Sequence, residues 1–158
     1  MSNLNISDWI HYDTTSYDSN YDQKVHDLIH QELSIRYPDY AHDVQIDFEE
    51  LSQFWLAKDH EDNVIGTVWL QITWITAELK KLFVSNNIRI QEKTQWISQS
   101  EKLSQRLFDH ASEYARTQWT KELTLSTSNP HAVKFYEKNG LQPLSSEGNI
   151  ISMKKDIE

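Results

Sequence analysis

Tyr136 and Glu78 are the two side chains of this sequence whose types and settings suit proton transfer. A phenol can act as a general acid and a carboxylate as a general base when each lies within reach of the reacting atoms. Trp69 and Trp74 are expected to form an apolar wall near Glu78, and the loss of water there would make the carboxylate more basic. The alternatives are a tyrosine that only packs beside Phe135 and a glutamate that is ion-paired or lies at the surface.

The segment that carries Tyr136 reads as a strand followed by a short helix. Leu123 and Leu125 alternate with polar residues, which is typical of a strand. Asn129 can cap the following helix through its side-chain oxygen, and the proline after it suits the first helical position. Gly140 offers the left-handed residue that closes a helix. The sequence therefore predicts a helix between Asn129 and Gly140, with the phenol near the edge of its apolar face.

The remaining elements are predicted from hydrophobic periodicity and from turn residues. The expected helices cover residues 21–35, a short segment anchored by Phe48 and Leu51, and residues 100–117. The expected strands cover residues 9–12, 54–59, 64–74, 77–84, 123–127, 141–144 and 149–153, with a turn around Gly148. This order predicts an α/β fold in which helices cover both faces of a mixed central sheet.

Several of these segments resemble the GNAT superfamily of N-acetyltransferases, whose members often carry Asn, Ala, Phe-Tyr and Gly at fixed spacing after a strand. The matching residues here are Asn129, Ala132, Phe135-Tyr136 and Gly140. The segment 77–84 is similar to the central strand that leads into the family's CoA-binding loop. With residues 113–116 and 123–127, the resemblance covers roughly residues 52 to 155 in one consistent order. It implies a mostly antiparallel sheet with splayed middle strands.

The resemblance implies transfer of an acetyl group from acetyl-CoA to an amine of a small molecule or a protein. Tyr136 would stand near the sulfur of CoA and protonate the leaving thiolate, and Glu78 would take a proton from the attacking ammonium. The backbone of Leu82, Phe83 and Val84 would pair with the pantetheine arm like an added strand. The alternative for these three residues is an ordinary core strand. Asn129 is a further cofactor-binding candidate, together with Gln99, Lys102 and Ser104.

The loop that should bind the CoA pyrophosphate departs from the family pattern. Family members place two glycines at the start of the helix, because small residues let backbone amides reach phosphate at the positive helix end. Counting back from the helix and strand that follow selects residues 99–104, which begin with Gln99. Lys102 and Ser104 then replace the two glycines, and Lys102 could supply charge to the phosphate.

A second count gives a different loop. Counting forward from Val84 selects residues 89–94, which begin with Arg89 and also lack glycine. The two counts differ by an insertion within residues 86–98. Arg89 would then supply the charge to phosphate. The sequence leaves both registers open.

Composition limits the classes of partner. The chain has 158 residues, and we expect one domain over residues 1–158 because domains commonly contain about 100–200 residues. A formal charge of −9 opposes binding to nucleic acid and favours a cationic substrate. The absence of cysteine, of an apolar stretch that could span a membrane and of a basic N-terminal segment predicts a cytoplasmic protein. The histidine spacings suit no metal site, and a homodimer is compatible with the resemblance.

Two other functions stay open at this stage. One is a catalytically degenerate GNAT-like domain that binds a ligand or a protein partner, which the missing glycine pair suggests. The other is an unrelated α/β binding module without splayed strands at Val84 and Leu125. Most of the tryptophans are expected to fill the core, and the alternative for Trp55, Trp69 and Trp74 is an aromatic wall that binds a cation.

Overall fold

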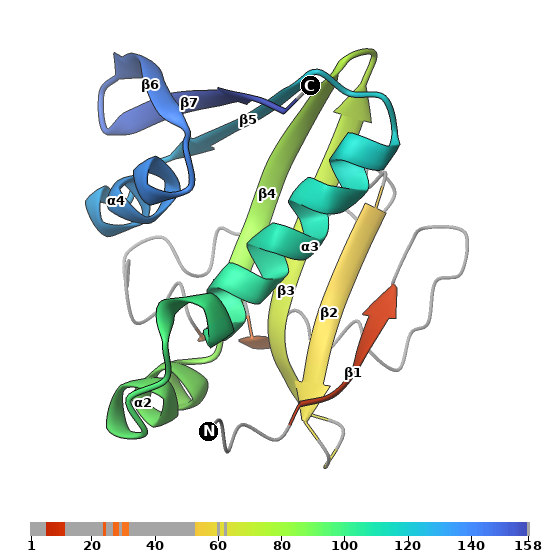
Figure 1. Cartoon of the computed structure of the whole chain (residues 1–158). Helices are drawn as coiled ribbons and strands as arrows, with labels where there is room; N and C mark the ends of the chain where they lie inside the picture. The colour runs from red at the N-terminus through yellow and green to blue at the C-terminus, as the bar shows by residue number, and fades with distance from the viewer. Residues whose placement is uncertain are drawn as a thin grey trace. The chain divides into compact units, whose positions relative to one another are not determined.

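The computed structural model of the chain describes residues 6–11, 24, 27–28, 30–31, 53–59, 61 and 63–157 (Figure 1). The strands are β1 (Ile6–His11), β2 (Gln53–Asp59), β3 (Val64–Thr73), β4 (Thr76–Val84), β5 (Glu122–Thr127), β6 (Gln142–Glu147) and β7 (Ile150–Asp156). The helices are α2 (Asn86–Thr94), the 3-10 turn η3 (Gln99–Glu101), α3 (Leu103–Thr117) and α4 (Pro130–Lys138). Among the described residues, the strands form one sheet in the order β1-β2-β3-β4-β5-β7-β6.

The sheet is mixed and mostly antiparallel, as predicted. The pairs β1–β2, β5–β7 and β6–β7 are antiparallel, and β4 runs parallel to β5. The register of β4 on β5 begins with Thr76 opposite Glu122 and its last pair is Glu78 opposite Thr124. β5 continues to Thr127 in its pairing with β7. The parallel pairing therefore covers the first part of β4, which agrees with the predicted splay of the middle strands.

The described residues belong to two compact units. Unit 1 comprises Met1–Trp69 and Lys81–His110, and unit 2 comprises Leu70–Lys80 and Ala111–Glu158. β3, β4 and α3 each contribute residues to both units, and each unit is described below by itself. The expectation of a single domain over residues 1–158 stays a prediction.

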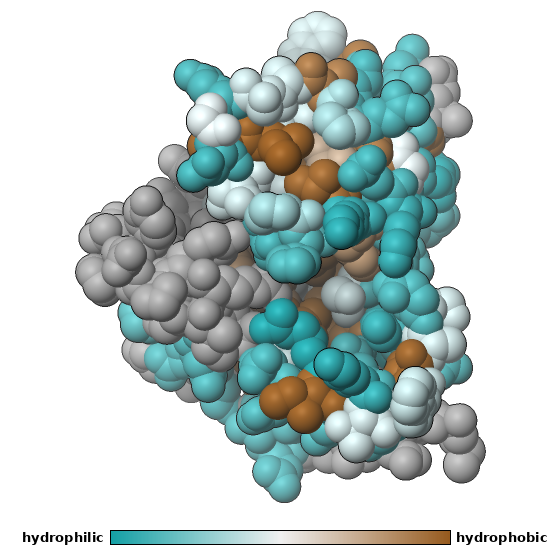
Figure 2. Space-filling view, turned by 90° about the vertical axis from the view of Figure 1, so that its left-hand side faces the viewer, coloured by the Kyte–Doolittle hydropathy of each residue, from teal (hydrophilic) through white to brown (hydrophobic). Residues whose placement is uncertain are grey.

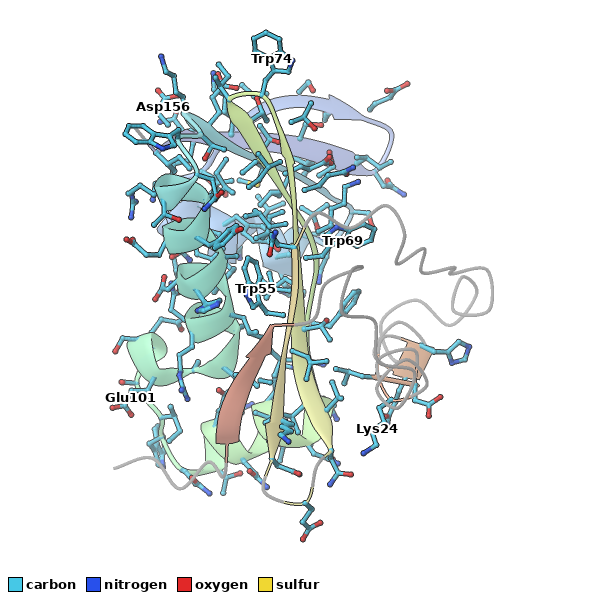
Figure 3. All side chains as sticks on the ribbon, turned by 90° about the vertical axis from the view of Figure 1, so that its right-hand side faces the viewer. Lys24, Trp55, Trp69, Trp74, Glu101 and Asp156 are labelled. Carbon is cyan, nitrogen blue, oxygen red and sulfur yellow. The ribbon has the colours of Figure 1, made fainter. Side chains whose placement is uncertain are left out.

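In unit 1, the start of α3 packs closely on β3. A Cβ placed on Gly66 would lie 2.9 Å from Leu107 Cδ1 and 3.1 Å from Leu103 Cδ2, and both leucines are fully buried. Trp55 makes an edge-on ring contact with His110 at 5.1 Å between centroids. Figure 3 shows Trp55 on the side of the sheet that carries α3 and the helical residues around Lys24 on the other side. Helices therefore cover both faces, as predicted.

In unit 2, β5 contributes buried residues to the core and α4 carries Tyr136. Leu123 and Leu125 of β5 are buried while Thr124 between them is partly exposed, which is the predicted alternation. Leu141 and Met153 are buried as well. β5 lies between β4 and β7 in the sheet, and successive side chains of a strand point to opposite faces of the sheet, which accounts for this alternation.

Several predicted boundaries shift. β1 begins at Ile6 instead of Trp9, and α3 begins at Leu103 instead of residue 100, because residues 99–101 form a 3-10 turn and Lys102 has extended dihedral angles. The two last strands are longer than expected, and Gly148 adopts the left-handed conformation between them, with φ of 61°. Of the helix predicted over residues 21–35, the described residues are helical. The predicted helix around Phe48 and Leu51 lies outside the described residues.

The expectation that the tryptophans fill the core is wrong for three of them. Trp55 and Trp69 are 3% and 4% exposed, but Trp74, Trp96 and Trp119 are 93%, 91% and 89% exposed. Each exposed tryptophan has a positive φ, at 56°, 55° and 64° in chain order, a conformation typical of turn positions. Figure 3 shows Trp74 pointing away from the chain at the turn between β3 and β4. On the face in Figure 2, hydrophobic side chains occur in small groups among hydrophilic ones.

Candidate active site

The N-terminus of α4 is fixed by the residues that the sequence assigns to it. Asn129 Oδ1 accepts a hydrogen bond from the amide of His131 at 3.0 Å, so Asn129 is the N-cap, and Pro130 takes the first helical position. The amide of Asn129 donates in turn to Thr127 Oγ1 at 3.1 Å. The predicted cap is confirmed. The side-chain oxygen of Asn129 is used for capping, and its predicted contact with the cofactor stays a prediction.

Tyr136 is held firmly near the other end of α4. The residue is 8% exposed, and its ring makes an edge-on contact with Phe135 at 5.3 Å between centroids. Its carbonyl accepts hydrogen bonds from the amides of Asn139 at 3.0 Å and Leu141 at 3.1 Å. Gly140 has φ of 92° and closes the helix as predicted. The phenol therefore sits on a well-defined support, and its role as proton donor stays a prediction.

Glu78 is an ion-paired and partly exposed side chain. Its Oε1 lies 3.6 Å from Lys80 Nζ, and 43% of the Glu78 side chain is exposed. Lys80 also donates to Gln71 Oε1 at 2.8 Å. The predicted apolar wall of Trp69 and Trp74 is wrong in part, because Trp74 is 93% exposed and cannot exclude water from the carboxylate. The role of Glu78 as a base stays a prediction.

Leu82, Phe83 and Val84 form the end of β4, where the pantetheine arm is predicted to bind. Leu82 and Phe83 are half-buried and Val84 is 3% exposed. The buried positions of β4 are odd-numbered at Ala77 and Leu79 and even-numbered at Val84. A residue inserted as a bulge would change the parity in this way. Backbone pairing with a ligand at this strand end stays a prediction.

The two registers of the phosphate loop fall in different elements of the structure. Residues 89–94 lie inside α2, so the forward count through Arg89 does not lead to the start of a helix. The assignment of the loop to phosphate stays a prediction. Residues 99–104 run through η3 into the first turn of α3, as the backward count required. Lys102 immediately precedes the first residue of α3, and Ser104 lies in its first turn. The insertion between the two counts is the helix α2.

Glu92 contacts the predicted phosphate loop, residues 99–104, and was not among the residues predicted from the sequence. It lies on α2 and is only 4% exposed, and its Oε2 accepts a hydrogen bond from the amide of Leu103 at 2.6 Å. Burial raises the pKa of Glu92, although the Leu103 amide and the charges of Lys102, Arg89 and Arg106 act in the opposite direction. The sequence gives only a weak indication that Glu92 is buried. Ile88 and Glu92 are one helical turn apart on the buried side of α2, and only the first of them is apolar.

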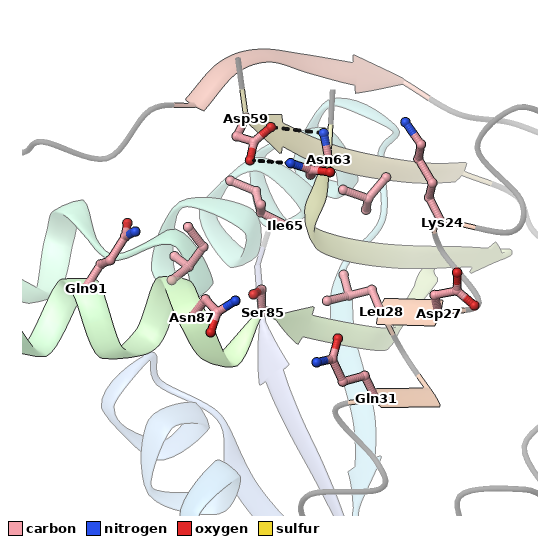
Figure 4. Close-up of a pocket in the computed structure, with 12 residues that line it drawn as sticks. Lys24, Asp27, Leu28, Gln31, Asp59, Asn63, Ile65, Ser85, Asn87 and Gln91 are labelled. Carbon is pink, nitrogen blue, oxygen red and sulfur yellow. Dashed lines mark hydrogen bonds between the residues drawn. The ribbon is translucent and has the colours of Figure 1, made fainter. Parts of the chain in front are cut away.

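A polar cavity of about 510 Å³ lies elsewhere in unit 1 (Figure 4). It lies among the turn between β2 and β3, the start of α2 and the helical residues around Lys24. Asp59 in its wall accepts hydrogen bonds from the amides of Glu61 and Asn63, both at 2.9 Å, and from Asn63 Nδ2 at 3.0 Å. None of the site residues predicted from the sequence lines this cavity.

Within the described part of the chain, no group of three or more histidine, aspartate or glutamate side chains is arranged to hold a metal ion. The helices of the same residues include none that is both long and apolar enough to cross a membrane.

The comparisons with known proteins identify the fold class. No model of a known protein family matches the chain. No curated protein matches it either. Among solved structures, similarity extends over nearly the whole chain to acetyltransferases of the GNAT family. The chain therefore has the GNAT fold, which confirms at the level of fold the resemblance seen in the sequence.

Three solved structures illustrate this similarity. The PaiA N-acetyltransferase of Thermoplasma acidophilum, solved in complex with coenzyme A, has a TM-score of 0.71 at 15% identity, with 95% of this chain and 99% of that chain covered. A GNAT-family acetyltransferase of Staphylococcus aureus has a TM-score of 0.67 at 19% identity, covering 96% and 100%. ElaA of Escherichia coli has a TM-score of 0.65 at 16% identity, covering 95% and 99%.

Proposed function

We propose that this chain transfers an acetyl group from acetyl-CoA to an amine by direct attack. The observation that carries the proposal is Tyr136, a buried phenol on a helix fixed at both ends, in a fold shared with acetyltransferases. One solved structure of that fold is a complex with coenzyme A. The residue that the sequence singled out for proton donation thus has the rigid support that a general acid requires.

The start of α3 also offers groups that could bind the phosphates of the cofactor. At the N-terminus of α3, the Glu92 carboxyl group accepts a hydrogen bond from the Leu103 amide at 2.6 Å. A helix N-terminus offers free amides and a positive end of the dipole, and Lys102 adds a cation beside it. We therefore assign Gln99, Lys102 and Ser104 to the phosphates. The end of β4 at Leu82, Phe83 and Val84 is assigned to the pantetheine arm by its backbone.

The reaction requires two proton movements, which we assign to unit 2. The amine nitrogen forms a bond to the thioester carbonyl carbon, and the carbon–sulfur bond breaks to release a thiolate. Glu78 accepts the proton that the attacking nitrogen loses, directly or through water. Tyr136 donates a proton to the thiolate sulfur. A phenol suits this step because its pKa of about 10 is comparable to that of a thiol.

Calorimetric titration with acetyl-CoA tests the proposal most directly. Binding in the micromolar to millimolar range together with a rise in melting temperature is expected, since a ligand that binds the folded state stabilises it. No heat and no thermal shift at millimolar acetyl-CoA would contradict the enzyme reading. An amine screen with a thiol-detecting assay then follows, because neither the sequence nor the fold selects the acceptor among small molecules and protein amino groups.

A second candidate function is a GNAT-like domain that has lost turnover and binds a ligand or a protein. The polar cavity in unit 1 favours it, because none of the residues that line the cavity is assigned to acyl transfer. The two glycine positions of the phosphate loop, filled by Lys102 and Ser104, favour it as well. Binding of acetyl-CoA without turnover of any amine would support this second function.

A further inference from the structure

The C-terminal end of α4, the helix that carries Tyr136, is held by a lysine from another element. Lys155 of β7 donates a hydrogen bond from its Nζ to the carbonyl oxygen of Asn139 at 2.9 Å. Asn139 is the C-cap residue of α4. A cation that donates to a carbonyl at this end of a helix also interacts favourably with the negative end of the helix dipole. The contact therefore ties the end of α4 to β7 within unit 2.

Asn139 connects this contact to the backbone of Tyr136. The amide of Asn139 donates to the Tyr136 carbonyl at 3.0 Å, and its Nδ2 donates to the Phe135 carbonyl at 2.9 Å. α4 has only nine residues, and so short a helix has little stability of its own. Its position therefore depends on contacts with the rest of unit 2. Because Lys155 holds the residue that closes the last turn, it restrains the backbone from which the phenol projects.

The stem of Lys155 lies against Gly140, the residue that follows Asn139. A Cβ placed on Gly140 would lie 3.2 Å from Lys155 Cε and 3.4 Å from both Cδ and Nζ. Gly140 also has φ of 92°, which disfavours any other residue there. The glycine that closes α4 thus also leaves room for the lysine that fixes the helix end.

The alternation of side chains along β7 directs Lys155 to this helix end. Successive side chains of a strand point to opposite faces of the sheet. Lys154 forms an ion pair with Glu122 Oε1 at 2.7 Å, whereas Lys155 is half-buried and reaches Asn139. Met153, which shares the face of Lys155, is fully buried. The strand therefore aims Lys155 toward the packed side of unit 2.

We propose that Lys155 is a positioning residue for acyl transfer, which holds the last turn of α4 so that the phenol of Tyr136 reaches the sulfur of the leaving thiolate. The inference rests on the proposed function, in which Tyr136 donates that proton. Lys155 acts through Asn139 and not on the reacting atoms. Misplacement of a catalytic group by about 1 Å can lower a rate by about 10²-fold, so a restraint on this helix end should affect turnover more than cofactor binding.

The test removes the hydrogen bond and keeps the length of the side chain. Lys155→Met lacks the donor and the charge, and Lys155→Arg keeps both. Lys138→Met is the matched control, because Lys138 is an exposed lysine in the last turn of the same helix. Thiol release from acetyl-CoA is measured on the full chain with hydroxylamine as the acceptor, well below the melting temperature of each variant. Hydrogen exchange of the Asn139 and Leu141 amides, which both donate to the Tyr136 carbonyl, is followed by NMR.

We expect Lys155→Met to lower kcat by about 10- to 100-fold and to change the KM for acetyl-CoA by less than about twofold. Lys155→Arg should keep kcat within about threefold of the parent, because it retains a charged donor. Lys138→Met should match the parent in kcat and in amide exchange. The amides of Asn139 and Leu141 should exchange faster in Lys155→Met. In a Tyr136→Phe background, Lys155→Met should cause no further loss of kcat, because the group that it would misplace is absent.

The outcomes separate this inference from the proposed function. If the parent releases thiol but Lys155→Met has an unchanged kcat, the positioning role is refuted and the proposed function stands, even where the amides exchange faster. An equal loss of kcat with and without the Tyr136 hydroxyl would refute it as well. If the parent binds no acetyl-CoA, the proposed function fails and the positioning role fails with it, while amide exchange still shows whether Lys155 fixes the end of α4. Should Lys155→Met not fold, Lys155→Gln takes its place with the same expectations.

Discussion

Replacing Gly66 by alanine should destabilise unit 1 through a steric conflict that can be located atom by atom. The new Cβ would lie 2.9 Å from Leu107 Cδ1, 3.1 Å from Leu103 Cδ2 and 3.4 Å from the carbonyl oxygen of Phe83. Methyl ends of leucine side chains usually rotate away from such a contact. Here Leu103 and Leu107 are both 0% exposed, so their side chains are enclosed by other core atoms.

The expected magnitude follows from two opposing effects. Overpacking of a dense core costs about 1–3 kcal/mol. The unfolded chain loses freedom when glycine becomes alanine, which favours folding by about 0.4–1 kcal/mol. The net loss for Gly66→Ala is therefore about 1 kcal/mol, or a fall in melting temperature of about 2–4 °C for a chain of this size. Gly66→Val should lose more, because its two methyl groups meet the same leucines.

Urea unfolding followed by circular dichroism measures these differences, and Leu107→Val provides the internal check. Leu107→Val removes the atom nearest to the new Cβ, so combining it with Gly66→Ala should cost less than the sum of the two single changes by about 1 kcal/mol. Gly148→Ala is the contrast, because its Cβ meets nothing within 4 Å and its φ of 61° alone disfavours alanine. If Gly66→Ala is as stable as the parent, or if the two changes are additive, the steric account is refuted.

Four further predictions address the site and its surroundings. Tyr136→Phe should lower turnover by roughly 10²–10⁴ with little change in acetyl-CoA affinity, and unchanged turnover in steady-state kinetics would remove this phenol from the mechanism. Glu78→Gln should lose most activity near neutral pH and regain part of it at high pH, where free amine is abundant, whereas a uniform loss in the pH–rate profile would indicate a structural role. Because burial raises the pKa of Glu92 above its ordinary value of 4.5, the folded chain retains this proton more strongly than the unfolded chain does. The stabilising contribution of Glu92 is thus complete below pH 4.5 and is lost as the pH rises through the raised pKa. Urea unfolding should therefore show that the parent loses stability relative to Glu92→Gln over that pH range. If the parent instead gains stability relative to Glu92→Gln as the pH rises, the raised pKa of Glu92 is contradicted. Trp96→Asn should raise the free energy of unfolding by about 1 kcal/mol, because asparagine tolerates the left-handed conformation better than a bulky residue, and a loss of stability would show that the exposed ring contributes more than this strain costs.

The candidate site was predictable from the sequence where its residues depend on close neighbours along the chain. The predicted cap of α4 required only that Asn129 reach the amide of His131, two residues later, and this contact forms. The closing role of Gly140 follows from its own backbone angle. The alternation along β5 follows from the period of a strand. These local features fix the position of Tyr136 on its helix without any tertiary contact.

Tertiary structure decided the features that depend on distant contacts. The hydrogen bond from Leu103 to Glu92 joins residues eleven positions apart through two helices and the turn between them, and no local pattern signals it. The wall expected beside Glu78 is wrong at Trp74, because this residue lies in a turn where its ring points to solvent. The placement of residues 89–94 inside a helix likewise depends on the insertion folding as α2. Local backbone geometry is thus determined by neighbouring residues, whereas the burial and the charge environment of the site arise only when segments far apart in the chain come together.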